Sequence, residues 1–171
     1  MKLVVFGLSV SSSWGNGHAV LWRALIRALA AEGAFVVFFE RDVPYYAEHR
    51  DLTAIEGGRL VVYDDWPAAR AAATAELRDA DAAIVTSYCP DAVAATELVL
   101  DAPGVHVFYD LDTPVTLARL AAGERVDYIG SRGLAPFDLV LSFTGGRALA
   151  ALAERLGARR VAPLYGSVDP E

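Results

Sequence analysis

The sequence predicts an α/β fold built on a mostly parallel sheet of six or seven strands. Two observations lead to this expectation. Short apolar runs alternate with stretches of helical periodicity along the whole chain, which is the order of elements in parallel-sheet proteins. The apolar runs are continuous, as in AFVVFFE at 34–40, and this is typical of strands covered on both faces. Right-handed crossovers between such strands produce a three-layer, Rossmann-like domain.

The composition describes one globular domain. The chain has 171 residues, of which 54% are apolar, so it can bury a core of its own and we expect one domain over 1–171. The single cysteine, Cys89, cannot form an internal disulfide and favours a reducing, cytoplasmic location. No run of about 18 apolar residues occurs, so no membrane span is expected. A net charge of −7 and scattered arginines argue against a nucleic-acid partner.

The first strand, loop and helix are the stretch around which the rest of the prediction is organised. An apolar run at 3–6 precedes the polar loop SSSWGNGH at 11–18, and a helical pattern follows as far as Gly33, which suits a C-terminal cap. The loop therefore lies at a helix N-terminus, where free N–H groups and the helix dipole attract phosphate and sugar oxygens. Plain turn geometry is the other explanation of its glycines. The candidate binding residues of the loop are Gly15, Asn16 and Gly17.

The second strand ends in Glu40. An acid about 20 residues beyond a glycine loop could hold a ribose, as in dinucleotide-binding folds, whereas a helix cap or a salt bridge with Arg41 would give it a structural task. The segment 41–58 is rich in turn residues, and we expect a loop that carries a short helix. Its Tyr45 and Tyr46 could stack on sugar rings as a wall of a cleft, or could pack at the solvent edge.

Three further strands are expected in the middle of the chain, at 59–64, 82–87 and 105–110. Proline favours the first turn of a helix, so Pro67 predicts a helix to about residue 79 and Pro114 predicts another. A helix between them ends near residue 100.

Polar residues follow two of these strands where ligands bind in such sheets. Ser87 and Tyr88 close the strand at 82–87, and Asp110 and Asp112 leave the next strand. Helix capping by Asp112 or the neighbouring threonine explains one carboxylate, and the other remains available to accept a hydroxyl proton.

Two other polar residues are expected to be structural. His106 lies inside a strand and is expected to be a hydrogen-bonded core histidine. Cys89 is expected to be a small packed residue rather than a nucleophile.

The last part of the chain predicts a second glycine-rich helix start. The segment 119–136 is irregular and is either a lid or a crossover. A strand at 138–143 then leads into a helix whose leucine stripe ends at Gly157, and a final strand covers 160–164. The residues at the start of that helix are Thr144, Gly145 and Gly146.

Four motifs resemble a known family: WGNGHA, YDLDTP, SFTGGRAL and the closing LGARRVAPLYGSVDP. Together they resemble the N-terminal domain of GT-B glycosyltransferases, most closely the spore-maturation (CgeB-like) group, and the resemblance covers essentially the whole chain. It implies transfer of a hexosyl-type sugar from a nucleotide-sugar donor to an acceptor hydroxyl, with the acceptor on this domain. PLYGSVDP looks like the strand and linker that enter a second, donor-binding domain. We therefore expect that domain to be absent from this chain and the isolated chain to be inactive.

The resemblance also implies roles for individual residues. Gly15, Asn16 and Gly17 would face the donor diphosphate or the acceptor, and His18 resembles the histidine that some GT-B enzymes use as a base. Asp112 is the other candidate base. Neither a metal nor another cofactor is implied. The remaining candidate substrate-binding residues are Glu40, Ser87, Tyr88, Asp110, Thr144, Gly145 and Gly146.

Two other functions stay open. A nucleotide- or NAD-binding oxidoreductase would place Glu40 on a ribose and the loop around Gly15 on a pyrophosphate, although the dinucleotide fingerprint is incomplete. A noncatalytic sugar- or nucleotide-binding module would use the same loop.

Overall fold

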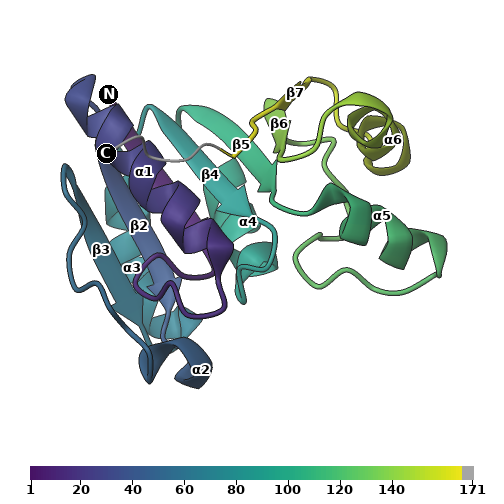
Figure 1. Ribbon diagram of the computed structural model, residues 1–171. Helices are drawn as coiled ribbons and strands as arrows, with labels where there is room; N and C mark the ends of the chain where they lie inside the picture. Colours follow the sequence, from purple (N-terminus) through teal and green to yellow (C-terminus); the bar gives the residue numbers. More distant parts are fainter. Residues whose placement is uncertain (167–171) are drawn as a thin grey trace.

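The computed structural model describes residues 1–166 and shows a seven-stranded sheet in which every strand runs parallel to its neighbours (Figure 1). The strands are β1 (Lys2–Gly7), β2 (Phe35–Arg41), β3 (Gly58–Tyr63), β4 (Ala82–Thr86), β5 (Val105–Asp110), β6 (Leu139–Ser142) and β7 (Val161–Pro163). The helices are α1 (Gly17–Ala31), α2 (Pro44–Ala47), α3 (Trp66–Leu77), α4 (Ala92–Leu100), α5 (Thr113–Ala121) and α6 (Gly146–Leu156). The predicted α/β, Rossmann-like fold class is confirmed, and the expected strands differ from the observed ones by one or two residues at their ends.

The strand order β3-β2-β1-β4-β5-β6-β7 reverses at β1. The chain moves through the sheet in one direction from β1 to β3, crosses back to β4 and continues in the opposite direction to β7. Because crossovers between parallel strands are right-handed, the two directions place their helices on opposite faces. Accordingly α1 packs on one face, and α3, α4 and α6 pack on the other (Figure 1).

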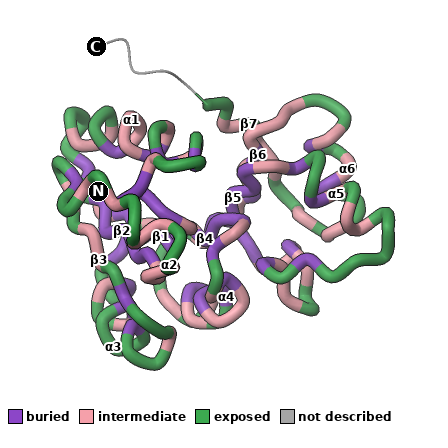
Figure 2. Tube along the Cα trace, turned by 60° about the horizontal axis from the view of Figure 1, so that its bottom comes forward, coloured by how far each residue is buried: buried purple, intermediate pink, exposed green. Residues whose placement is uncertain are grey.

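Each face of the sheet has its own apolar cluster. On the α1 face, the ring of Trp22 meets Phe38 edge-on at 5.5 Å. On the opposite face, Phe6 and Phe39 stack at 5.0 Å against the small alanines of α3. Burial of side chains as large as these contributes about 1.5–3 kcal/mol each. The buried residues therefore follow the central strands of the sheet (Figure 2).

The irregular segment between α5 and β6 is a packed crossover. Tyr128, Leu134 and Phe137 are buried in the same cluster as Leu152 of α6. A lid would have to leave this core in order to open, so of the two alternatives expected from the sequence the crossover is the one that forms.

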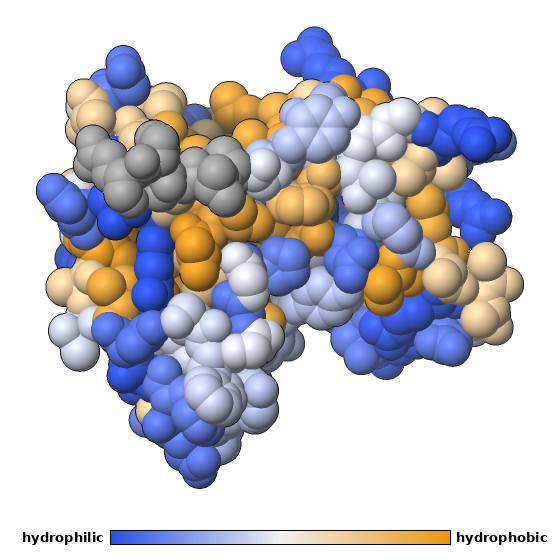
Figure 3. Space-filling model, viewed as in Figure 1, coloured by the Kyte–Doolittle hydropathy of each residue, from blue (hydrophilic) through white to orange (hydrophobic). Residues whose placement is uncertain are grey.

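The face that carries α1 is incompletely covered by the described residues. Ile84, Leu141 and Phe143 point to that face and are only half-buried, and apolar side chains gather across its middle beside α1 (Figure 3). Within residues 1–166, no helix has both the length and the apolar character needed to cross a membrane.

Candidate functional site

The candidate site lies at the edge of the sheet formed by the carboxyl ends of the strands. The strand order reverses between β1 and β4, so the loops that follow these two strands leave the sheet in opposite directions. Such a switch point opens a crevice in which α/β proteins bind ligands. The loop after β1 and the residues after β4 and β5 surround it, and these segments contain most of the predicted site residues.

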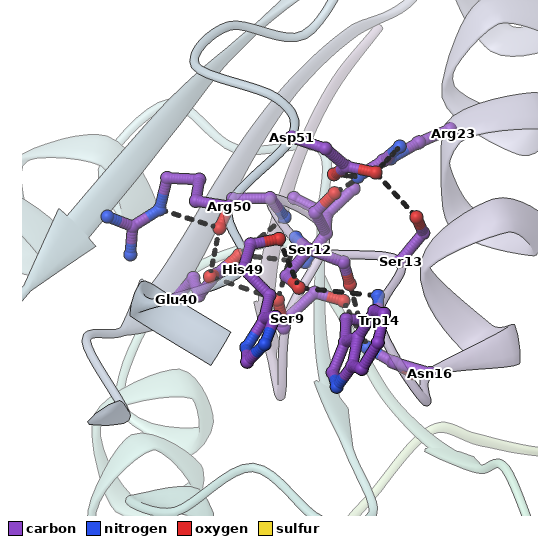
Figure 4. Close-up of polar contacts among 12 residues, drawn as sticks. Ser9, Ser12, Ser13, Trp14, Asn16, Arg23, Glu40, His49, Arg50 and Asp51 are labelled. Atoms are coloured by element: carbon purple, nitrogen blue, oxygen red, sulfur yellow. Dashed lines mark hydrogen bonds and ion pairs between the residues drawn. The ribbon is translucent and has the colours of Figure 1, made fainter. Parts of the chain in front are cut away.

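Glu40 anchors the loop after β1. Its side chain is fully buried and pairs in register beside Gly7. One carboxylate oxygen accepts hydrogen bonds from the backbone N–H groups of Val10 and Ser11, at 2.7 and 2.9 Å. The other accepts from the hydroxyls of Ser9 and Ser11, at 3.1 and 2.5 Å (Figure 4). A carboxylate has about four acceptor positions, so the loop fills them all.

This arrangement gives Glu40 a different task from those expected. A ribose hydroxyl could bind the carboxylate only by displacing one of the four donors. The structural alternatives expected from the sequence are also wrong: Glu40 caps no helix, and Arg41 pairs with Asp91 at 3.2 Å instead. A serine-rich loop beside a strand that ends in an acid is the sequence pattern that corresponds to this arrangement.

Two arginines hold the same loop from outside. Arg50 donates from Nε to the Ser11 hydroxyl at 2.9 Å and from its terminal nitrogen to Asp42 at 2.8 Å. Arg23 of α1 forms an ion pair with Asp51 at 2.5 Å. Hydrogen bonds from the Arg23 and Ser13 side chains lower the pKa of the Asp51 carboxyl well below its usual range. The loop is therefore fixed to β2, to α1 and to the segment after α2.

The glycine-containing turn leads from this anchored loop into α1. Asn16 is buried at the N-cap position, and its amide donates to the carbonyls of Ser9 and Ser12, at 3.1 and 3.4 Å, rather than capping the helix. Gly15 adopts φ of +58° with the hydroxyl of Tyr45 against it. Gly17 is exposed, and a side chain there would meet nothing within 4 Å. The two glycines therefore differ: the turn requires Gly15, and space lies open beside Gly17.

His18 lies in the first turn of α1 and borders a hollow. The hollow has a volume of about 60 Å³ and lies between α1 and the ends of β5 and β7. Burial lowers the pKa of His18, and the Asp112 carboxylate opposes this shift. Nδ1 of the ring is buried and makes no hydrogen bond within the described part of the chain. Nδ1 is therefore not the nitrogen that faces a substrate. The hollow is lined by His18, Leu21, Trp22, Leu25, Tyr109, Leu111, Leu164, Tyr165 and Gly166.

Asp112 occupies the N-cap position of α5, but its side chain makes no capping bond. Its carboxylate accepts a long hydrogen bond of 3.5 Å from the hydroxyl of Tyr88. Tyr88 has φ of +64°, in the left-handed region that side chains rarely adopt. Backbone strain of this kind is concentrated at functional sites. Asp112, Tyr88 and His18 thus come from three separate segments at the same sheet edge, where Tyr88 is hydrogen-bonded to Asp112 and the Asp112 carboxylate acts on the pKa of His18.

Asp110 and Ser87 are buried beneath this group. Ser87 accepts a hydrogen bond from the backbone N–H of Leu111 at 2.8 Å, which links the ends of β4 and β5. One oxygen of Asp110 accepts from the Asp112 amide and the Thr116 hydroxyl, at 3.2 and 3.1 Å, and the other is buried without a partner among residues 1–166. Burial raises the pKa of the Asp110 carboxyl. Both residues support the crevice from below and do not face its opening.

The residues Thr144 to Gly146 form the predicted second glycine-rich helix start, at α6. Gly145 is the N-cap, and the hydroxyl of Tyr165 fills the position that a side chain on Gly145 would need. Thr144 is tied to Ser142, whose hydroxyl donates to the Thr144 carbonyl at 2.7 Å. This turn lies at the same sheet edge, and Phe143, which precedes it, meets the His18 ring edge-on with ring centres 6.4 Å apart.

The residues expected to be structural are so. Cys89 is buried, and burial raises the pKa of its thiol to about 12. His106 is partly buried, and its Nε2 lies 2.9 Å from the Ala102 carbonyl. No group of three or more histidine, cysteine or acidic side chains within the described residues is placed to hold a metal ion.

The closing motif of the sequence extends past the structural description. Ser167 to Pro170 of PLYGSVDP lie outside the described residues, so the expected linker to a second domain remains a prediction.

Comparison with known proteins gives no relative: no protein-family model matches the chain, and no curated protein matches it significantly.

Proposed function

We propose that this chain is the acceptor-binding domain of a GT-B glycosyltransferase of the CgeB-like group. The observation that carries the proposal is that Tyr88 is hydrogen-bonded to Asp112, and the Asp112 carboxylate acts on the pKa of His18, at the sheet edge where the strand order reverses. The domain supplies the acceptor side and the base, and a second domain supplies most of the contacts to the nucleotide-sugar donor.

In the proposed reaction His18 is the general base. Its lowered pKa keeps the imidazole neutral near pH 7, so Nε2 can accept the proton of an acceptor hydroxyl. The acceptor oxygen then bonds to the anomeric carbon of the donor, while the bond from that carbon to the diphosphate breaks and its electron pair leaves with the diphosphate. Asp112 stabilises the imidazolium that forms. General-base catalysis contributes about 10²–10⁴-fold to such rates.

The burial of Glu40 supports this proposal over a dinucleotide-dependent oxidoreductase. An acid that holds a ribose needs at least one oxygen free at the crevice, and the four hydrogen bonds to the loop occupy both oxygens of Glu40. The incomplete glycine fingerprint points in the same direction.

Calorimetry of this chain with a panel of nucleotide sugars and with NAD tests whether the donor is bound mainly by a second domain. We expect donor affinity weaker than micromolar and no donor hydrolysis, because one wall of a cleft leaves the diphosphate in water, where electrostatic stabilisation is weak. Micromolar donor binding or hydrolysis would show that the chain is not an acceptor-side half. Binding of NAD would favour the oxidoreductase.

The base is tested by transfer assays on this chain joined to a donor-binding domain. His18→Ala should lower the transfer rate by about 100-fold or more, and the exposed α1 variant Val20→Ala serves as the control. Unchanged transfer by the His18 variant would remove His18 from the mechanism.

A further inference from the structure

An aromatic stack lies on the outside of the loop after β1, where the proposed reaction gives it no task. The indole of Trp14 stacks face to face on His49, with ring centres 4.6 Å apart and planes 8° from parallel. Trp14 is nevertheless 56% exposed. His49 covers one face of the indole, so the exposed area of Trp14 belongs largely to the other face and to the ring edge. Tyr45, 54% exposed, adjoins His49 with ring centres 6.2 Å apart.

Hydrogen bonds fix the backbone of both residues of the stack and the ring of His49. The hydroxyl of Ser12 donates to the His49 carbonyl at 2.9 Å and accepts from the Trp14 backbone N–H at 3.3 Å (Figure 4). Nδ1 of His49 lies 3.1 Å from the Tyr45 carbonyl, and the Tyr45 hydroxyl packs against Gly15. A ligand that stacks on Trp14 would not have to order the ring first, and this lowers the entropic cost of binding.

The surroundings of the stack are polar, and both arginines near it are paired with acids. Ser13 donates to Asp51 at 2.5 Å, and Asp51 is paired with Arg23. Arg50 is likewise paired with Asp42. Since both arginines are paired and Glu48 beside His49 adds a negative charge, nothing in these contacts favours an anionic ligand, and the polar groups can hydrogen-bond a neutral one at its edges.

The platform by itself is much smaller than a stable protein interface. A stable protein interface covers about 800 Å² on each partner, whereas this surface is one indole with an imidazole and a phenol beside it. A sugar ring fits such a surface, because its C–H face meets the electron-rich face of an aromatic ring and its hydroxyls reach the polar rim.

We propose that the acceptor is a carbohydrate and that one of its rings, other than the one that reacts, stacks on Trp14. This inference rests on the proposed function and names the substrate class of the same site. Trp14 is four residues from His18, a span of at most about 14 Å along the chain. A short oligosaccharide can therefore present a hydroxyl to His18 while its neighbouring ring lies on the indole.

Intrinsic tryptophan fluorescence of this chain tests the proposal directly. Trp14 is exposed, whereas Trp22 is buried and Trp66 is half-buried, so a ligand on the platform changes mainly the Trp14 emission. Titration with neutral di- and trisaccharides should give a saturable change in emission. Calorimetry should show affinity lowered at least tenfold by Trp14→Ala and largely retained by Trp14→Phe. Phe35→Ala, an exposed aromatic at the opposite end of a strand, should bind as the unmodified chain does.

Three results would overturn the inference: no saccharide binding up to millimolar concentration, equal binding by the Trp14→Ala chain, or a Trp14-dependent response to nucleosides or apolar alcohols but not to sugars. Circular dichroism of each variant, together with His49→Ala as a second way to weaken the stack, separates lost binding from lost folding. Other results would contradict the proposed function without contradicting this inference, or the reverse. If the chain binds saccharides but the protein joined to a donor-binding domain transfers no sugar, the proposed function is wrong and the carbohydrate site remains. If that protein transfers sugar to a non-carbohydrate acceptor and Trp14→Ala does not change the rate, the carbohydrate site is wrong and the proposed function remains.

Discussion

The carboxylate of Glu40 is buried, and it accepts four hydrogen bonds, all from the loop after β1. The two backbone N–H groups of Val10 and Ser11 depend on it, because a buried donor without a partner costs about 1–3 kcal/mol. The carboxylate therefore determines where the loop begins its path to the crevice.

Substitution of Glu40 should reveal this dependence in the free energy of unfolding. Glu40→Gln keeps an oxygen for both N–H groups and should cost about 1–2 kcal/mol, whereas Glu40→Leu leaves both unpaired and should cost about 3–5 kcal/mol. Urea unfolding at neutral pH measures both values. Equal stability of the two variants would mean that the loop finds other partners.

His18 and Asp112 are linked electrostatically, and the link can be measured without any substrate. The Asp112 carboxylate raises the pKa of His18 against the larger, lowering effect of burial. In Asp112→Asn the pKa should fall further, as followed by NMR titration of the imidazole. The exposed Asp101→Asn is the control and should leave the titration unchanged. An unaltered His18 pKa in Asp112→Asn would show that the two residues do not act together.

Asp110 should make stability depend on pH. Its folded-state pKa is raised by burial, so its contribution to stability is fully present below the unfolded-state value of about 4 and is lost as the pH rises through the folded-state value. Relative to the unmodified chain, Asp110→Asn should therefore gain stability as the pH rises from about 4 toward neutrality. Denaturant unfolding across this range measures the difference, and a difference that does not vary with pH would contradict the assignment.

At the scale of elements, the turn between β1 and α1 combines a strained entry with an open helix start. The side-chain amide of Asn16 donates to the carbonyls of Ser9 and Ser12, so α1 begins without a side-chain cap. The Ala19 N–H donates to the Asn16 carbonyl at 3.2 Å, and no side chain caps the N–H groups before it, which is the arrangement that suits an oxygen-rich substrate.

The two glycines of this turn should respond differently to the same substitution. Gly15→Ala forces a side chain into φ of +58° and against the Tyr45 hydroxyl, and should destabilise the fold by about 1–2 kcal/mol. Gly17→Ala meets no atom within 4 Å and should stay within about 0.5 kcal/mol of the unmodified chain. Thermal and urea unfolding of the two variants measure the difference in stability. Equal losses would mean that Gly17 too has a structural role.

At the scale of the whole molecule, the two apolar clusters share the central strands, so the sheet should unfold as a unit. We expect the chain to fold without a partner and to lose its circular dichroism and its tryptophan fluorescence in one coincident urea transition. Separate transitions for the two signals would show that the α1 side, which holds Trp22, unfolds independently.

The sequence by itself determined the order and type of the elements. Continuous apolar runs and helical spacing are local properties, and chain direction together with right-handed crossovers then leaves few sheet topologies. The same reasoning placed Asp112, Tyr88 and the glycine turn at one edge, because the carboxyl ends of parallel strands all meet there. Cys89 and His106 could also be assigned structural roles from their immediate neighbours.

Only the tertiary structure decided what each of these side chains does at that edge. Glu40 was expected to face a ligand or a neighbour in the sequence, but its partners lie about 30 residues earlier in the chain and become adjacent only when β2 pairs with β1. The stack of Trp14 on His49 brings together residues 35 positions apart, and Asp110 differs from Asp112 only in depth. Hydrogen-bond partners, burial and hence pKa depend on distances between segments, and local sequence patterns contain no information about those distances.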